Sequence, residues 1–493
     1  MSYVRQVRKN PLAGTDFIIF FVSKTLQGGI MKGLFIFGEI KDVWQSGKKF
    51  SVRNFCFSLL QKRPKYFSGR NIVCFCMLFI FTSSGLLMSE EIPLKRLNDF
   101  AKKIEQVRSE EMGYPVNQNT HLKEFYEWYY KSKLYNVSLN NVGDPQQPSI
   151  YPMNTHEFEN EVIKFFAPLY GFSEEEAWGI VTHSGTDGNM HGMYFGAKNL
   201  LGKTKQLPIV YVSEEAHYSI KRIADLQNLE IRLIKTDETG KMIISEFEKA
   251  LDPSKPALVV IAMGTTFKGA IDDMEAIDEV LNRKKPVAVF RHVDAALFGG
   301  YLPFTEHKKL VDRRVGHFDS IAVSGHKFFG FDEPMGIFIT TKEVKDQTNP
   351  FKVSYLNEAV PTITCSRNAI SALKFWWKVK KTGYEGFEQQ AKAILENARY
   401  LEEQLNKIGY KAWRNPYSNT VYFHRPSDKI MKKYALAPEF DERLGGKMAH
   451  IVVMQHNTRK FLDEFIKDLK AEGTPEPSHL MEKDVETKPK HWH

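Results

Sequence analysis

The spacing of apolar residues divides this 493-residue chain into three parts. Residues 1–87 contain short apolar runs separated by lysine-rich gaps. Residues 175–345 alternate apolar runs rich in β-branched and aromatic side chains with stretches of helical spacing. Beyond residue 350 long amphipathic stretches dominate. These changes of pattern indicate that the three parts fold differently.

The middle part predicts a sheet whose strands are separated by helices. Helical spacing occurs at Ile220–Leu226 and Met274–Leu281. Strand character occurs in six runs, which are Leu207–Val212, Glu230–Ile234, Ala257–Met263, Val287–Phe290, Ser320–Ser324 and Ile337–Thr341. Near-continuous apolar strands that alternate with helices are typical of a mostly parallel sheet covered by helices on both faces. We therefore predict an α/β fold, in which ligands bind beyond the carboxyl ends of the strands.

Helical spacing dominates on either side of this predicted sheet. Before it, helices are predicted at Ile92–Arg108, Leu122–Tyr135 and Glu157–Tyr170. After it, a smaller C-terminal α+β domain is predicted from helices at Ala369–Lys380, Tyr384–Ile408 and Arg459–Glu472 and from short strands at Lys411–Arg414 and Thr420–His424. We expect five segments: an N-terminal extension (1–87), a helical segment (88–150), a large domain (151–350), a small domain (351–473) and a disordered tail (474–493).

The first 87 residues differ from the rest of the chain in charge. They hold thirteen Lys or Arg against three Asp or Glu, a net charge of +10, so the formal +9 of the whole chain leaves −1 for residues 88–493. The excess of positive charge therefore does not belong to the predicted globular part. We accordingly expect no nucleic-acid partner.

An apolar run near the end of this N-terminal part, Ile72–Phe81, follows four basic residues between Lys62 and Arg70. Its ten residues fall short of the roughly 20 needed to cross a bilayer as a helix. The segment fits a membrane-associating leader, an extension without a folded role upstream of a functional chain that starts at Met88, or an ordered accessory element. We favour the second interpretation, under which membrane contact arises only if residues 1–87 are retained.

Cysteine usage is typical of a reducing compartment. Cys365 is the single cysteine after Met88, so residues 88–493 have no intrachain disulfide framework. Cys74 and Cys76 lack the spacing and the second pair of a zinc site, and we predict no metal centre. We expect a cytoplasmic protein, with membrane association through the N-terminal hydrophobic segment as the alternative.

Lys327 is the strongest candidate for covalent chemistry. It follows the buried-looking strand Ser320–Ser324 and precedes Phe328 and Phe329. A lysine in such surroundings loses hydration, so its pKa falls and its amine becomes nucleophilic. The alternative is a solvated surface lysine. Asp294, at the end of another predicted strand, can hold a pyridinium nitrogen protonated, so the pair suggests a Schiff-base lysine for pyridoxal phosphate.

Two further elements fit the same cofactor. Ser184-Gly185-Thr186 opens a predicted helix, whose free N–H groups and dipole favour a phosphate, although a capped turn looks the same. His217 follows the strand at Leu207–Val212 and suits stacking on a cofactor ring, although a core histidine is the alternative. Asp294, likewise, can be read as a capping residue at a strand end.

Taken in this order, the motifs resemble the group II pyridoxal-phosphate-dependent amino acid decarboxylases, in particular the bacterial-type histidine decarboxylases and their plant serine decarboxylase relatives. The resemblance runs from about Gly113 to Leu469 and lies wholly beyond Met88. The matching motifs are Tyr114-Pro115, Asn141 to Asp144, Gly185-Thr186, Gly188-Asn189, Ala216 to Ser219, Gly264 to Thr266, Gly269 to Asp273, His292, Asp294 to Ala296, Ser324 to Lys327, Ser366 to Asn368 and Ala412 to Asn415.

The resemblance implies a fold-type I transferase fold, with pyridoxal 5'-phosphate bound in the large domain. It assigns Lys327 as the Schiff-base lysine, Asp294 as the partner of the pyridinium nitrogen, and His217 as the catalytic residue that stacks on the ring near the substrate. The remaining cofactor contacts are assigned to Ser184, Gly185, Thr186, Ser324 and His326. Tyr355 is placed in a mobile loop that contacts substrate, and a homodimer is implied because relatives build the site at a subunit interface.

The reaction implied is decarboxylation of an L-amino acid to its amine, with histidine as the leading substrate and serine or an aromatic amino acid as alternatives. Another reaction on the same cofactor, such as aminotransfer or aldol-type cleavage, and a cofactor-binding protein without turnover stay open. The chain departs from the family pattern at His183 to Asn189, at Ala369-Ile370 and at Gly330 to Gly336. The cofactor is therefore better supported than the substrate.

Overall fold

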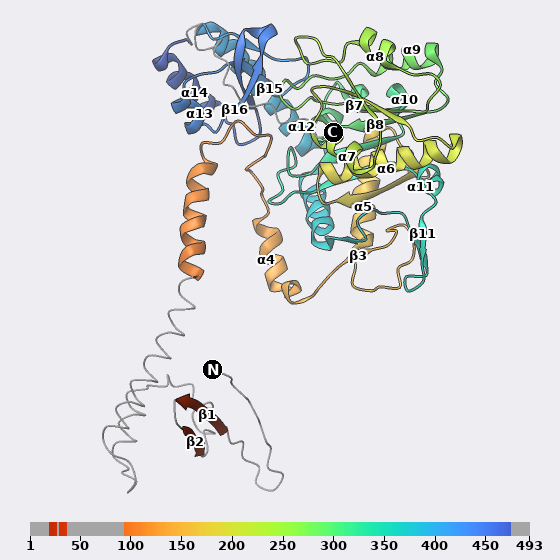
Figure 1. The fold of residues 1–493 in the computed structure, drawn as a ribbon. Helices are drawn as coiled ribbons and strands as arrows, with labels where there is room; N and C mark the ends of the chain where they lie inside the picture. Colours follow the sequence, from red (N-terminus) through yellow and green to blue (C-terminus); the bar gives the residue numbers. More distant parts are fainter. Residues whose placement is uncertain (1–18, 27–28, 37–92, 475–493) are drawn as a thin grey trace. The chain divides into compact units, whose positions relative to one another are not determined.

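The computed structural model describes residues 19–26, 29–36 and 93–474 (Figure 1). The chain divides into two compact units, residues 1–103 and 104–493. In the first unit, β1 (Ile19–Leu26) pairs with β2 (Gly29–Ile36) in antiparallel fashion. The apolar run at residues 72–81 and all of the predicted tail after residue 474 lie outside the described residues, and the predicted segment boundaries stay predictions.

The second unit is built on a mixed seven-stranded sheet with the order β4-β10-β9-β8-β7-β5-β6, counted within residues 93–474. Its strands are β4 (Ala177–Thr182), β5 (Ile209–Ser213), β6 (Ile231–Ile234), β7 (Ala257–Ala262), β8 (Val289–Asp294), β9 (Ser320–Ser324) and β10 (Gly336–Thr341). The pairs from β6 to β9 are parallel, and β10 runs antiparallel to both neighbours. The predicted mostly parallel α/β sheet is confirmed.

Side chains of the sheet enter two separate hydrophobic cores because successive residues of a strand point to opposite faces. Along β5, Ile209 and Tyr211 belong to one core, and Val210 and Val212 belong to the other. The first core also receives α5 (His156–Phe166), α8 (Ile244–Ala250), α9 (Met274–Lys284) and α12 (Ala369–Lys407). The second receives α6 (Gly185–Thr204) and α7 (Ser219–Leu226). Helices therefore cover both faces, as the strand pattern predicts.

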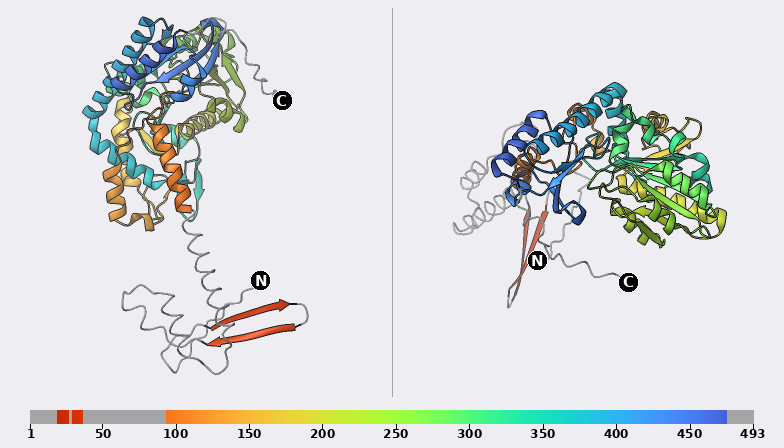
Figure 2. Two further views of the ribbon diagram at one scale, coloured as in Figure 1. Left: turned by 90° about the vertical axis from the view of Figure 1, so that its left-hand side faces the viewer. Right: turned by 90° about the horizontal axis from the view of Figure 1, so that it is seen from above.

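A smaller antiparallel sheet and its helices form the C-terminal part (Figure 2). Its strand order is β14-β15-β17-β16, and a separate core of buried side chains lies against it. The elements are β14 (Ala412–Trp413), β15 (Thr420–His424), α13 (Asp428–Lys433), β16 (Ala437–Asp441), β17 (Gly446–Val452) and α14 (Arg459–Glu472). The long α12 leads into this part and is interrupted at Gly383, whose φ of 64° breaks the helical geometry. The two helices predicted at Ala369–Lys380 and Tyr384–Ile408 are therefore confirmed, with Gly383 between them.

Residues 93–108 form the helix predicted there, but every residue of it is exposed. Its apolar residues are 46 to 63% exposed; they are Leu94, Leu97, Phe100, Ile104 and Val107. Further elements are α4 (Lys123–Lys131), α10 (Arg313–Gly316), α11 (Lys342–Gln347), and the strand pairs β3 (Asn141–Val142) with β13 (Ser366–Arg367) and β11 (Phe351–Val353) with β12 (Glu358–Val360).

Candidate active site

The predicted chemical residues converge at one edge of the large sheet. The strands β5, β8 and β9 are parallel, and β4 has the same direction because β10 runs antiparallel to both β4 and β9. Their carboxyl ends therefore share an edge. The candidate residues directly follow these ends, with Ser184 after β4, His217 after β5, Asp294 as the last residue of β8, and Lys327 after β9.

The first turn of α6 provides a seat for an anion. Ser184 caps the helix in an extended conformation, and its Oγ accepts a hydrogen bond from the backbone N–H of Asp187. The first N–H groups of a helix have no intrahelical partner, which leaves those of Gly185 and Thr186 to a ligand. A Cβ on Gly185 would lie 2.3 Å from Ser324 Oγ. Glycine at this position therefore lets the helix terminus approach the end of β9.

A row of glycines continues this close approach along α6. A Cβ on Gly188 would lie 2.8 Å from that of Ala322, and one on Gly192 would lie 2.2 Å from the ring of His292. His292 is fully buried, and its ring bonds Ser320 Oγ and Asn189 Oδ1 at 2.9 and 3.0 Å. Burial lowers the pKa of His292 to about 4. This neutral histidine thus fixes α6 over the ends of β8 and β9.

Lys327 lies in a backbone loop that is held from two other segments. Its carbonyl accepts a hydrogen bond from the N–H of Asn117 at 3.3 Å, and Asn117 Nδ2 donates to the next carbonyl, that of Phe328. Gln455 Nε2 donates to the same Phe328 oxygen at 2.8 Å. Burial lowers the pKa of Lys327, while the negative charge of Asp294 opposes this shift. A lowered pKa increases the fraction of unprotonated amine, which is the form that nucleophilic chemistry needs.

His217 lies within electrostatic range of both Lys327 and Asp294. Burial lowers the pKa of His217; the charge on Asp294 raises it, and that on Lys327 lowers it further. Its Nδ1 lies 2.8 Å from Ser219 Oγ, which orients the ring. Asp294 is 7% exposed and accepts a hydrogen bond from the N–H of Ala296 at 3.1 Å. The structure therefore brings together the three residues predicted to carry the chemistry.

The two remaining candidates differ in position. His326 is partly buried beside Lys327, its Nδ1 lies 3.3 Å from the carbonyl oxygen of Met335, and burial lowers its pKa. Tyr355 lies in the turn between β11 and β12 and is 78% exposed. Within residues 93–474 no hydrogen bond or ring contact joins Tyr355 to the other candidate residues, so its substrate role stays a prediction.

The departure from the family pattern after Lys327 has a partner elsewhere in the chain. Lys374 Nζ, on the buried side of α12, bonds Asp332 Oδ1 at 2.9 Å and Glu333 Oε1 at 3.0 Å. Tyr126 donates to the other oxygen of Asp332, and Ser371 Oγ donates to Glu333. These two carboxylates are therefore engaged within the chain. Sequence patterns gave no signal for Asn117, Gln455 or Lys374, which lie up to 211 residues from their partners.

The assembled residues fit pyridoxal phosphate. The gap kept by Gly185 places helix N–H groups and Ser324 where a phosphate can be bound, and Asp294 and Lys327 supply the carboxylate and the amine on the same sheet edge. A mostly parallel α/β sheet with these groups at its carboxyl edge defines a pyridoxal-phosphate enzyme of fold type I.

Comparison with known proteins supports the assignment of this site to a pyridoxal-phosphate enzyme. The family profile described as the pyridoxal-dependent decarboxylase conserved domain matches residues 147–411. Histidine decarboxylase of Solanum lycopersicum is 33% identical over 384 residues, which are 76% of this chain and 88% of that protein. Serine decarboxylase 1 of Oryza sativa subsp. japonica is 33% identical over 364 residues, covering 73% and 71%. The chain belongs to the pyridoxal-dependent decarboxylase family.

A solved structure supports the fold. L-methionine decarboxylase from Streptomyces sp. 590 superimposes with a TM-score of 0.67 at 22% identity, over 77% of this chain and 95% of that one. The fold-type I prediction is thereby confirmed. The family membership makes this protein a carboxy-lyase that uses pyridoxal phosphate to decarboxylate an amino acid.

The described residues contain neither a candidate membrane span nor a candidate metal site. No helix among them is both long and apolar enough to cross a bilayer. No group of three or more His, Cys, Asp or Glu side chains among them is arranged to hold a metal ion.

Proposed function

We propose that this decarboxylase acts on L-histidine and releases histamine and CO2. The observation that carries the proposal is the convergence of Lys327, Asp294 and His217 at the carboxyl edge of the sheet, in a chain 33% identical to a histidine decarboxylase. L-Serine is the second candidate substrate, because a serine decarboxylase is equally similar in sequence.

Each residue has a distinct task in the proposed site. When bound, pyridoxal phosphate supplies an electron-accepting ring that withdraws the electron pair left by departing CO2. Lys327 would hold the cofactor covalently and yield that bond to the substrate amine, since its lowered pKa favours the neutral nucleophile. The Asp294 carboxylate would keep a proton on the ring nitrogen. The N-terminus of α6, with Ser184, Gly185 and Thr186, would bind the phosphate together with Ser324 and His326.

His217 would cover one face of the ring. Its partial burial and its hydrogen bond to Ser219 restrict the orientation of the imidazole. A lowered pKa keeps this imidazole neutral near neutral pH, so it can stack on an aromatic ring without a charge to hydrate. It would also guide the proton that replaces the lost carboxylate.

The test is to incubate the purified holoenzyme with each of the twenty amino acids and to measure CO2 and amine. Histamine from histidine is the expected product. Ethanolamine as the main product would transfer the proposal to serine, and keto-acid formation without CO2 would replace decarboxylation by aminotransfer. A bound chromophore with no turnover of any amino acid would indicate a protein that binds the cofactor without catalysis.

We further propose that the active form is a homodimer. The exposed apolar side chains of residues 93–108 support this, because an uncovered amphipathic face of this kind favours burial against another surface. Sedimentation equilibrium is expected to give twice the chain mass. Replacing Leu97 and Phe100 by Ser is expected to shift the enzyme towards monomer; a monomeric wild-type holoenzyme would contradict the proposal.

Residues 1–87 are proposed to have no part in catalysis, and the enzyme is proposed to be cytoplasmic. The family match begins at residue 147, and the candidate residues all lie beyond residue 183. The full chain and a form starting at Met88 should show equal kcat, and both should fractionate with the cytosol. Recovery of the full chain alone in the membrane fraction would establish the alternative, attachment through the N-terminal segment.

A further inference from the structure

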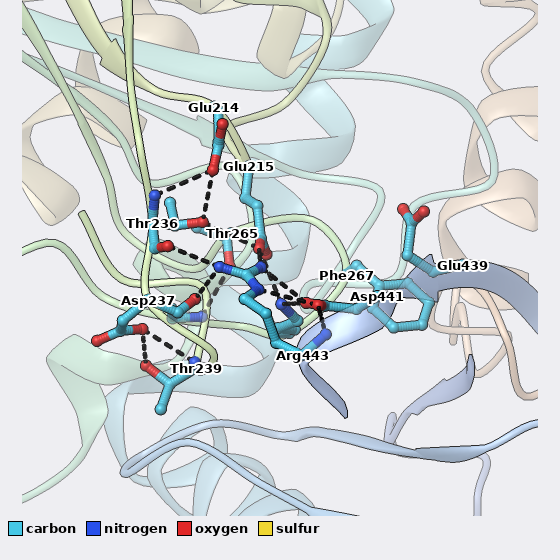
Figure 3. A network of polar contacts seen from close by, with 12 residues as sticks. Glu214, Glu215, Thr236, Asp237, Thr239, Thr265, Phe267, Glu439, Asp441 and Arg443 are labelled. Atoms are coloured by element: carbon cyan, nitrogen blue, oxygen red, sulfur yellow. Dashed lines mark hydrogen bonds and ion pairs between the residues drawn. The ribbon is translucent and has the colours of Figure 1, made fainter. Parts of the chain in front are cut away.

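An ion-pair cluster around the buried Lys268 joins the small domain to the turn between β5 and α7 (Figure 3). Its four charged members are Glu215, Lys268, Asp441 and Arg443. Glu215 lies in the turn between β5 and α7, and Lys268 lies in the loop after β7. Asp441 ends β16, and Arg443 follows it in the small domain. The cluster therefore spans both domains.

Lys268 is the centre of this cluster. Its side chain is 2% exposed, and its Nζ bonds Glu215 Oε1 at 2.8 Å and Asp441 Oδ2 at 2.5 Å. Although burial raises the pKa of Asp441, hydrogen bonds from Arg443 and Lys268 outweigh this and lower it to about 2. The two cations and two carboxylates balance in charge. Displacement of Lys268 would leave its two carboxylates without their buried cation, whereas the side chain of Arg443 is 40% exposed.

Arg443 extends the cluster across the domain boundary. Its Nη2 bonds Glu215 Oε1 at 2.9 Å and Asp441 Oδ2 at 2.7 Å. Its Nη1 donates to the carbonyls of Thr236 and Asp237 at 2.6 and 2.8 Å. Arg443 of the small domain therefore binds both the segment after β6 and Glu215, as the dashed contacts in Figure 3 show.

Glu215 is the member that reaches the active site. Its Oε1 accepts hydrogen bonds from Lys268 and Arg443 and lies 3.1 Å from Thr236 Oγ1. Only Ala216 separates it from His217. The backbone of the turn is tight, because Ala216 N–H donates to the Ser213 carbonyl at 3.1 Å and Ile220 N–H to that of His217 at 3.0 Å. Glu215 and His217 therefore lie in one short, hydrogen-bonded turn.

We infer that the cluster positions His217, so that docking of the small domain sets the histidine over the cofactor ring. Glu215, Lys268, Asp441 and Arg443 are positioning residues: they act through the turn and touch neither cofactor nor substrate. The inference rests on the proposed stacking role of His217. It assigns the small domain a part in catalysis through Asp441 and Arg443.

The test is a double-mutant cycle on the holoenzyme. Arg443→Met is expected to lower kcat about tenfold, with KM changed less than about twofold, and to reduce the visible circular dichroism per bound cofactor. In a His217→Ala background the same substitution should change kcat by less than about twofold. Arg443→Lys should recover part of kcat, because it keeps a cation beside Glu215 and Asp441.

A second variant and a control guard against simple loss of folding. Glu215→Gln keeps the size of the side chain, and it should lower kcat about fivefold with the same dependence on His217. Lys345→Met is the matched control. Lys345 lies on α11 and pairs with Asp144 and Asp346, and α11 packs against α6 and against β4 and β10 at the opposite edge of the sheet from β5 and β6. This control should leave kcat and the circular dichroism unchanged.

Two results would overturn the inference. One is an equal loss of kcat from Arg443→Met with and without His217, which would assign the cluster to stability alone. The other is unchanged circular dichroism in both cluster variants. If no amino acid is decarboxylated, the proposed function fails. The circular dichroism of the bound cofactor would still report whether the cluster affects the position of His217 relative to the cofactor ring.

Discussion

Two lysines differ in their surroundings: Lys268 is buried and Lys327 is partly buried. Lys268 contacts two carboxylates at 2.8 and 2.5 Å. No ion pair with Lys327 is found among the described residues, and burial lowers its pKa against the opposing charge of Asp294. Lys268 is therefore a fixed structural cation, and Lys327 is a candidate nucleophile.

The comparison shows why burial alone does not make a lysine reactive. Desolvation penalises the ammonium form, so an unpaired lysine gives up its proton more readily. A carboxylate in direct contact restores the charged form and removes the lone pair needed for attack. The two lysines therefore differ in reactivity because their partners differ.

The largest effect is expected from Lys327→Ala. Removing the amine that holds the cofactor should reduce turnover by on the order of 1000-fold or more and should abolish the absorbance of the covalently bound cofactor. Steady-state kinetics and visible spectra measure both. The Lys345→Met variant is the control and should retain both signals. Retention of turnover by Lys327→Ala would remove the distinction between the two lysines.

Lys268→Met should instead act mainly on stability. It leaves the carboxylates of Glu215 and Asp441 without their buried cation, which is expected to lower the free energy of unfolding by about 3–5 kcal/mol. Urea denaturation measures this loss. Arg283→Met, which removes an exposed pair with Glu248, should leave the unfolding midpoint unchanged. Equal effects of the two variants would show that the Lys268 cluster is solvated.

Glu111 tests the same rule with a carboxylate. Burial raises its pKa to about 7, although hydrogen bonds from Tyr114 and Gln118 oppose this shift. The folded state then binds a proton more tightly than the unfolded state, so the free energy of unfolding should fall as pH rises from about 4.5 to 7. In Glu111→Gln this fall should be smaller by up to about 3 kcal/mol. Urea denaturation at pH 5 and pH 8 measures the free energy of unfolding of both proteins. The same change between the two pH values in wild type and variant would contradict the prediction.

The smallest effects concern two glycines of α6. Gly185→Ala places a Cβ 2.3 Å from Ser324 Oγ, and it should weaken retention of pyridoxal phosphate about tenfold. Gly202→Ala meets no atom within 4 Å in the same helix and should raise stability by about 0.5–1 kcal/mol. Dialysis against cofactor-free buffer and thermal unfolding compare the variants. Unchanged cofactor retention in Gly185→Ala would argue against a phosphate at this helix terminus.

Local patterns were sufficient to predict much of the fold. The strand at Ser320–Ser324 was predicted with its observed bounds, as were the strand at Thr420–His424 and the helix at Arg459–Glu472. The strand β4 was not predicted, although its six residues are all buried and only Gly179 among them strongly disfavours a strand. Apolar periodicity is a local property, so it predicts elements and leaves their pairing undetermined.

In the candidate site, too, some residues could be predicted from the sequence and others could not. Lys327, Asp294 and His217 follow strand ends, so a parallel sheet brings them together without further information. Lys268 reads as an ordinary loop lysine in the sequence, because its partners Glu215 and Asp441 lie 53 and 173 residues away. Likewise Asp332 and Glu333, which depart from the family pattern, pair with Lys374, and this pairing is visible only in the folded chain. Long-range polar partners of this kind carry no local pattern.

The most direct measurement of the central claim is to identify the lysine that holds the cofactor. Borohydride reduction of the holoenzyme makes that bond permanent, and peptide mass spectrometry then locates the modified residue. The expected result is one pyridoxyl group on Lys327, with Lys268 unmodified. Modification of Lys268 or of another lysine in place of Lys327, or no modification of a protein that turns over substrate, would contradict the account.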